Sequence, residues 1–333
     1  MVYIYKKPIG DKNYYYLRAS EKKGKKLITK DVAYLGSSIE EVKLNLDKLS
    51  KYKNKIRKSY KKINSFLESN HFLEKVQKLK LKQDPFLRER TNESEACKLH
   101  YNGAFKKLDK QTQKEILQNF IIEFSYNTAS IEGNTINLEE ARNLLNEGVT
   151  PKNKTLREIY DLQNTEKVFL DLYLNGHNEL NHELIIGIHD KLLEKIDERK
   201  GYRTTDVRVI RSNFEATPGK YVKTDMNLLI KWLNENKLKL NPIVLAIVFH
   251  HKFEKIHPFM DGNGRTGRMI MNFILLNNKM PPMIIHKKLR ETYLEAMREA
   301  DESDLWELTE KNYKELIDYG ANEFIAGYWD IFL

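Results

Sequence analysis

The most constraining feature of the chain is a twelve-residue stretch, HPFMDGNGRTGR at 257–268, which lies between two apolar segments with helical spacing. The preceding segment, NPIVLAIVFHHKFEKI, begins with an Asn–Pro pair that suits the start of a helix. The following segment, MIMNFILLNN, predicts a buried helix. The fold must therefore bring two buried helices together at a turn that is crowded with glycine, charged and imidazole groups.

Three glycines in this turn, Gly262, Gly264 and Gly267, match the G-x-G-x-x-G pattern of dinucleotide-binding folds. That pattern normally follows a strand and has an acidic residue about 20 positions later. Here a helix is expected before it, and Lys287 occupies the later position. A calcium loop fails at Arg265, where an oxygen ligand is needed. A bare turn between helices explains the glycines but not the His, Asp, Asn and two Arg around them.

The side chains of this turn together favour phosphoryl or nucleotidyl transfer. Backbone N–H groups at 262–264 can form an anion-binding nest, and a helix that begins near Arg265 adds its positive end. Asp261 offers an oxygen ligand for Mg²⁺, and His257 is a candidate general base. The candidate phosphate-binding residues are Gly262, Asn263, Gly264, Arg265, Thr266, Gly267 and Arg268.

The same stretch matches every fixed position of the pattern H-P-F-x-[D/E]-G-N-G-R-x-x-R, so the chain resembles the Fic (filamentation induced by cAMP) family over residues 110–320. The resemblance implies a mainly α-helical bundle with a β-hairpin flap. It also implies an enzyme that uses ATP as substrate and Mg²⁺ as cofactor to transfer AMP to a Ser, Thr or Tyr hydroxyl of a target protein.

The resemblance also assigns a role to each residue of the motif. His257 would deprotonate the target hydroxyl, and Asp261 would hold Mg²⁺ between the α- and β-phosphates. Asn263 would lie near the α-phosphate, Arg265 would contact the leaving pyrophosphate, and Arg268 would contact the γ-phosphate. These assignments describe a site that acts by positioning and by charge neutralisation.

Two further segments extend the likeness. The β-branched alternation and the Pro–Gly turn of 201–223 predict a hairpin that is similar to the family's flap. By resemblance the flap pairs with the target backbone as an added strand, through Val209, Ile210, Arg211 and Ser212. In the segment RETYLEAMREADESD, the resemblance makes Tyr293 a neighbour of the adenine ring.

The segment TASIEGN at 128–134 resembles the family's inhibitory pattern [S/T]-x-x-x-E-[G/N], with Thr128, Glu132 and Gly133 in register. In the family this glutamate pairs with the second arginine of the signature, which implies a pair between Glu132 and Arg268. A carboxylate on that guanidinium competes with the γ-phosphate for the same donors. The resemblance therefore implies an autoinhibited enzyme. Glu132 could also orient a water that removes AMP from a modified target.

Residues 1–85 lie outside the resemblance and carry most of the positive charge. Residues 1–90 hold 24 Lys and Arg against 10 Asp and Glu, in a chain whose net charge is +10. The pattern predicts a β-hairpin with Gly24 at its bend, basic helical sequence up to Lys82, and a polar connector over 83–103. The expected division is a basic region at 1–85 and a Fic catalytic region at 110–320, with an inhibitory helix near 115–134.

The basic region suits a nucleic acid or another acidic partner, although a solvated lysine-rich surface would look the same. A single cysteine, Cys97, and the absence of a leader or a long apolar run favour a cytoplasmic protein without membrane contact. A homodimer is left open.

Other functions also fit the sequence. One is a nucleotide-sensing regulator that binds DNA through the basic N-terminus. Another is transfer of a different group, such as UMP or phosphate, by the same motif.

Overall fold

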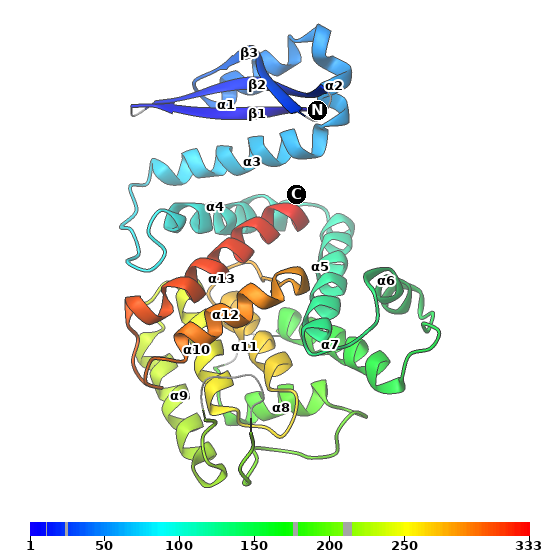
Figure 1. Ribbon diagram of the computed structural model, residues 1–333, viewed down its shortest axis with the longest axis vertical. Coiled ribbons are helices and arrows are strands. Elements are labelled where there is room, and N and C mark those ends of the chain that lie inside the picture. Colours follow the sequence, from blue (N-terminus) through cyan, green and yellow to red (C-terminus); the bar gives the residue numbers. More distant parts are fainter. Residues whose placement is uncertain (11, 24–25, 176–178, 209–214) are drawn as a thin grey trace.

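The computed structural model describes residues 1–10, 12–23, 26–175, 179–208 and 215–333, and these are mainly helical, as predicted (Figure 1). A small β-sheet forms one end of the molecule, α3 lies beneath it, and the body of the protein lies beyond α4 (Figure 1). The strands are β1 (Val2–Ile9), β2 (Lys12–Lys23) and β3 (Lys26–Gly36). The helices are α1 (Ile39–Asp47), α2 (Lys53–Lys58), α3 (Tyr60–Gln77), α4 (Arg90–Gly103), α5 (Lys110–Ile131), α6 (Leu138–Glu147), α7 (Leu156–Asn175), α8 (His182–Leu192), α9 (Val222–Asn236), α10 (Pro242–Ile256), α11 (Asn263–Asn277), α12 (Arg290–Ala300) and α13 (Glu310–Ile331).

The N-terminal strands form an antiparallel sheet in chain order, so the predicted hairpin corresponds to β2 and β3 and the structure adds β1. The bend predicted at Gly24 lies outside the described residues. Alternate residues of the strands, such as Ile4, Tyr15 and Leu17, are buried in a core that also contains apolar residues of α1 and α3. The opposite face of the sheet contributes nothing to this core.

The prediction of a polar connector over 83–103 is wrong, because residues 90–103 form helix α4. The buried residues Ala96, Cys97, His100 and Tyr101 lie at helical spacing on one side of α4, which packs against α3 and α13. Tertiary packing thus outweighs the low helical propensity of a polar sequence. Phe72 of α3 belongs to the same hydrophobic cluster as the body helices.

Helices α10 and α11 lie at the centre of the body and position the motif between them. Asn241 caps α10, accepting a hydrogen bond from the Ile243 amide at 2.9 Å, and α9, α11 and α13 all pack on this helix. Gly267 allows α11 to approach α10 closely, since a Cβ there would lie 2.5 Å from Nδ1 of His250. The cap and the glycine together fix the angle at which the chain enters and leaves the motif.

The hairpin predicted over 201–223 is not formed as expected at its C-terminal side. Residues 219–221 make a 3-10 turn and Val222 begins α9, so the strand predicted at Tyr221 and Val222 is wrong. Thr217 Oγ1 donates to Asp225 of α9 at 2.7 Å, which favours helix entry over strand pairing. The flap residues Val209, Ile210, Arg211 and Ser212 lie outside the described residues.

Among the helices in the described ranges, none combines the length and the apolar character that a membrane crossing requires.

Candidate active site

The motif forms a short loop that starts and ends with left-handed backbone. His257 follows the last residue of α10 with φ of 52°, and Gly262 precedes α11 with φ of 78°. Asn263, not Arg265, is the first residue of α11. Its side chain closes the loop, because Nδ2 donates to the Phe259 carbonyl at 2.9 Å and Oδ1 accepts from the Phe259 amide at 2.8 Å. The amide group of Asn263 therefore has a structural role in addition to the phosphate contact that the sequence predicts.

Arg203, which was not predicted from the sequence, holds this loop from the other side. Its buried guanidinium donates to the carbonyls of Ile256 and His257, at 3.2 and 2.7 Å, and to those of Thr205 and Thr217. The carbonyls at the C-terminal end of α10 are thus satisfied by a side chain from the segment that leads towards the predicted flap. The left-handed turn at His257 is stabilised by this contact.

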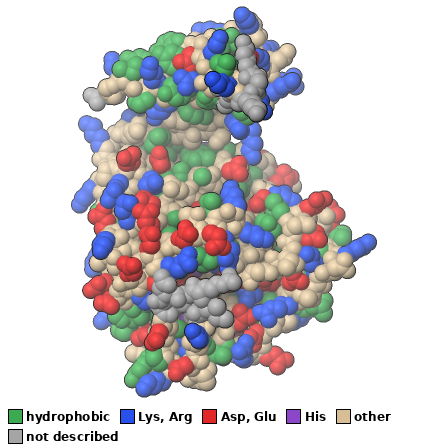
Figure 2. Space-filling model, viewed as in Figure 1, with side chains coloured by type: hydrophobic (Ala, Val, Ile, Leu, Met, Phe, Trp, Pro, Cys, Tyr) green, Lys and Arg blue, Asp and Glu red, His purple; other side chains and the backbone are tan. Residues whose placement is uncertain are grey.

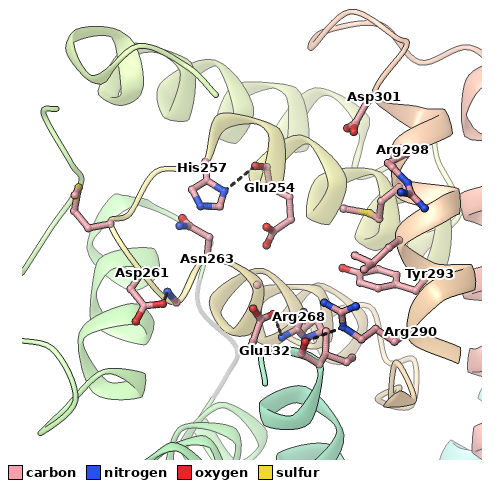
Figure 3. A pocket seen from close by; sticks show the side chains of 16 residues that line it. Glu132, Glu254, His257, Asp261, Asn263, Arg268, Arg290, Tyr293, Arg298 and Asp301 are labelled. Carbon is pink, nitrogen blue, oxygen red and sulfur yellow. Dashed lines mark hydrogen bonds and ion pairs between the residues drawn. The ribbon is translucent and has the colours of Figure 1, made fainter. Parts of the chain in front are cut away.

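A cavity of about 290 Å³ opens beside the loop (Figure 3). Its lining combines the N-terminal end of α11 with residues from the ends of α5 and α10 and from α12. His257, Asp261, Asn263, Arg268 and Tyr293 all line it. Gly262, Gly264 and Glu132 line it as well, whereas Arg265, Thr266 and Gly267 do not. The structure thus brings most of the predicted site residues to one cavity, although they span residues 132–293.

His257 is oriented by its neighbour along the chain. Its Nδ1 donates to the Glu254 carbonyl at 3.3 Å, because a carbonyl oxygen can only accept. Nε2 is therefore the nitrogen that carries the lone pair when the ring is neutral. Burial lowers the pKa of His257 below its ordinary value, so the neutral ring predominates near pH 7. This is the form that a general base requires.

Arg268 bonds to residues at the end of α5 through two of its three nitrogens. Its Nε donates to Thr128 Oγ1 at 2.6 Å, and its Nη2 donates to the Thr128 carbonyl at 3.1 Å and to Glu132 Oε1 at 2.7 Å. The Arg268 side chain is 2% exposed and that of Glu132 is 39% exposed. The structure therefore places Thr128 and Glu132 of the inhibitory pattern on Arg268.

The carboxylate of Glu132 also lies against the first turn of α11. A Cβ built on Gly264 would come within 2.2 Å of Glu132 Oε1, so only a glycine leaves room for the carboxylate at this place. The N-terminal end of a helix attracts negative charge through its free N–H groups and its dipole. Glu132 thus fills the position where the helix and Arg268 would together favour an anion.

Arg265 points away from the cavity into a buried ion-pair network. Its Nη1 lies 2.5 Å from Asp161 Oδ1, and its Nη2 lies 3.2 Å from Asp261 Oδ1. Arg157 contacts the other oxygen of Asp261. Neither Asp161 nor Arg157 was predicted from the sequence. Asp161 had a detectable signal, since it is an acidic residue on the buried side of the helix predicted over 155–174.

Asp261 is the residue that the sequence proposes as a metal ligand. Burial acts to raise its pKa, but Arg265, the Gly262 amide and Arg157 together hold that pKa below its ordinary value, so the group is ionised. No three His, Cys, Asp or Glu side chains in the described part of the chain are grouped to hold a metal. One ionised carboxylate at a cavity wall suits Mg²⁺, which commonly takes one or two carboxylates and completes its shell with phosphate and water.

Two buried groups complete the cavity. Tyr293 OH lies 2.6 Å from Nε2 of His250, so the phenol edge is fixed while the ring lines the cavity. Glu254, which the sequence analysis missed, points its carboxyl towards the centre of the cavity (Figure 3). Burial, followed by the nearby Glu132, raises the pKa of Glu254 to about 8. Glu254 is therefore mainly protonated at pH 7.

Comparison with known proteins finds a family model and relatives that match this part of the chain. The family model described as "Fic/DOC family" matches residues 179–275. Protein adenylyltransferase fic-1 of Caenorhabditis elegans is 31% identical over 187 residues, which are 55% of this chain and 37% of that protein. A probable protein adenylyltransferase of Aquifex aeolicus is 30% identical over 168 residues, half of each chain. This chain thus spans only about half, or less, of the length of these relatives.

A solved structure supports the fold. A Fic domain containing signaling protein from Bacteroides thetaiotaomicron superposes with a TM-score of 0.63 at 24% identity, and the likeness covers 70% of this chain and 94% of that chain. At this identity the likeness concerns the arrangement of the helices alone.

Proposed function

The chain carries a Fic/DOC family domain, and on this premise we propose that it is a protein adenylyltransferase held in check by Glu132. The reaction would transfer AMP from ATP to a Ser, Thr or Tyr hydroxyl of a target protein. The observation that carries the proposal is the position of Glu132, whose carboxylate fills the anion position at the start of α11 and on Arg268. A site shaped for a carboxylate at that place is also shaped for phosphate oxygens.

In the proposed reaction, Nε2 of His257 accepts the proton of the target hydroxyl as its oxygen attacks the α-phosphorus. A bond forms between that oxygen and the phosphorus, the α–β phosphoanhydride bond breaks, and pyrophosphate leaves. The N–H groups at the start of α11, together with Arg268, neutralise phosphate charge. Asn263 and Arg203 hold the loop so that His257 stays aimed into the cavity.

A magnesium ion fits this site through Asp261, with phosphate and water as its remaining ligands. When bound, it would supply neutralisation of the charge on the phosphate groups. Arg157 now contacts one oxygen of Asp261 from the protein surface, and we propose that it yields this oxygen to the metal. Tyr293 lines the wall of α12, and we propose that the adenine lies against this wall.

Inhibition follows from competition for the same donors. With Glu132 on Arg268, the γ-phosphate loses its guanidinium partner, and ATP is displaced from the geometry that in-line attack requires. Removal of the Glu132 side chain frees both Arg268 and the first turn of α11.

The decisive experiment incubates Glu132→Gly with ATP labelled at the α- or the γ-phosphate, with Mg²⁺ and a protein extract. Label transfer from α-labelled ATP only is expected, and it should vanish in the double variant Glu132→Gly/His257→Ala. Transfer of the γ-label would indicate a kinase instead. Lack of any transfer, with intact ATP binding, would favour a nucleotide-sensing role. Parallel reactions with UTP test for transfer of UMP.

A further inference from the structure

We propose that the outer face of the N-terminal sheet is a binding site for single-stranded nucleic acid. The outer face is defined here as the side chains of β1, β2 and β3 that point away from α1 and α3. The proposal is independent of the transferase chemistry, because this face lies at the end of the molecule opposite to the catalytic body (Figure 1).

The outer face carries aromatic rings where a solvated sheet face normally carries polar side chains. Successive residues of a strand point to opposite faces, so burial of Ile4, Tyr15 and Leu17 places their neighbours outside. The outward tyrosines are Tyr3, Tyr5, Tyr14, Tyr16 and Tyr34.

The strand register brings these tyrosines side by side. Tyr5 pairs with Tyr16, and Tyr16 pairs with Tyr34, so one row crosses all three strands. The rings of Tyr16 and Tyr34 are 5.4 Å apart, and those of Tyr14 and Tyr34 are 6.5 Å apart. Tyr34 is 53% exposed although it is aromatic. Tyr14, Tyr16 and Tyr34 thus form an aromatic cluster on the outer face, and the Tyr5 ring beside it is covered by the Arg18 guanidinium.

Arg18 extends the flat surface. Its guanidinium lies 3.5 Å from the centre of the Tyr5 ring, and it donates to both oxygens of Asp31, at 2.6 and 3.3 Å. The ion pair holds the guanidinium beside the Tyr5 ring, and an Arg guanidinium can itself stack on a base. The Asp31 carboxylate thus positions Arg18 instead of repelling a ligand.

The charge around this face complements a phosphate backbone. By strand alternation and register, the basic residues on the outer face are Lys7, Lys12, Arg18 and Lys22, against one acidic residue, Asp31. Figure 2 shows the N-terminal end of the molecule covered mostly by apolar and basic side chains. Aromatic platforms flanked by basic side chains are the usual means of binding single strands.

The aromatic row favours a single strand over a duplex. Stacking on tyrosine needs an exposed base face, and paired bases within a duplex present only their edges. Neighbouring strands are about 4.8 Å apart, so the row is about 10 Å wide and has room for about two or three bases.

The test measures fluorescence anisotropy of labelled oligo(dT), oligo(U) and a duplex of equal length with the full chain. We expect both single strands to bind in preference to the duplex, with an affinity that falls as salt rises. The two single-strand arms show whether DNA or RNA is preferred. Tyr34→Ala and Tyr16→Ala should each weaken binding about ten-fold, since each removes a ring on which one base stacks.

Controls separate stacking from charge and from misfolding. Tyr60→Ala removes a tyrosine on α3 that is 64% exposed, and it should leave the affinity unchanged. Tyr34→Phe keeps the ring and should retain binding. Lys7→Ala should reduce the salt dependence by about one phosphate contact. Thermal melting of every variant checks that the sheet is folded.

Several outcomes would overturn the proposal. These are a preference for the duplex, no binding at low salt, or equal affinities for the wild type and for a folded Tyr16→Ala/Tyr34→Ala variant. A wild-type dimer in analytical ultracentrifugation that this double variant dissociates would also overturn it, because the face would then be a protein interface.

Discussion

Oε1 of Glu132 lies 2.7 Å from Nη2 of Arg268, although 136 positions separate the two residues in the chain. The pair connects the end of α5 with the first turn of α11, and it fills the anion position beside the candidate base. On the proposed function, inhibition and catalysis share this guanidinium, and variants at this pair test both.

We expect Glu132→Gly to bind Mg²⁺-ATP more tightly than the wild type. A charge-assisted hydrogen bond contributes about 1.5–3 kcal/mol, so a gain in affinity of about ten-fold or more is expected when phosphate no longer competes with the carboxylate. Isothermal titration calorimetry measures this affinity. Glu139→Gly on the exposed side of α6 makes the same change of charge and should leave it unchanged. Equal affinities for wild type and Glu132→Gly would contradict the competition.

Gly264→Ala should lower the free energy of unfolding of the wild type. In the Glu132→Gly background the same substitution should lower it by a smaller amount. In the wild type the added methyl group would lie 2.2 Å from Glu132 Oε1, and the carboxylate must move. Without Glu132 the nearest remaining atom is an Arg268 nitrogen at 3.0 Å. A double-mutant cycle on the free energy of unfolding should give a coupling of about 0.5–3 kcal/mol. Additive effects would mean that Gly264 does not accommodate Glu132.

Asp161→Asn should destabilise the fold strongly, by about 3–5 kcal/mol, because it leaves the buried Arg265 charge without its main partner. The matched control is Asp171→Asn on the same helix. Asp171 pairs with Lys191, but their side chains are 44% and 61% exposed, so a loss of about 0–1 kcal/mol is expected. Urea unfolding of both variants measures the difference. Similar losses at the two positions would refute a structural role for the buried pair.

As the pH is lowered, the rate of AMP transfer by Glu132→Gly should remain constant down to pH values at which an ordinary histidine is already protonated. Burial lowers the pKa of His257 below 6.5, so its neutral, proton-accepting form persists to lower pH. The rate should therefore fall only on the acidic side of that value. A pH–rate profile of kcat/KM checks this prediction. A midpoint above 6.5 would show that another group limits the reaction.

The wild type should lose stability relative to Glu254→Gln as the pH rises from about 5 to about 8. The folded-state pKa of Glu254 is raised to about 8 from 4.5. The protonated carboxyl therefore contributes fully to the free energy of unfolding below the pKa of the unfolded chain. This contribution is lost as the pH rises towards the pKa of the folded protein. Glutamine remains neutral throughout. Free energies of unfolding across this range measure the change, and parallel curves for the two proteins would exclude a buried acid.

The sequence identified the motif, the helices around it and the pair between positions 132 and 268, because local patterns and a family resemblance encode them. Helix α4 was missed, since its polar composition predicts a loop and only the packing of Cys97 and Tyr101 reveals a helix. For a related reason, the sequence did not reveal the roles of Arg203, Asp161 and Glu254. Each acts through contacts between elements far apart in the chain, which single-sequence periodicity does not record.

The four carbonyl contacts of Arg203 have a mechanical consequence. They join the end of α10 to Thr205 and Thr217, which flank the segment expected to receive the target. Because one guanidinium bonds all four carbonyls, a displacement of Thr205 or Thr217 would shift the backbone of His257 with it. On the proposed function, a substrate that docks beside these residues would thereby influence where the imidazole points.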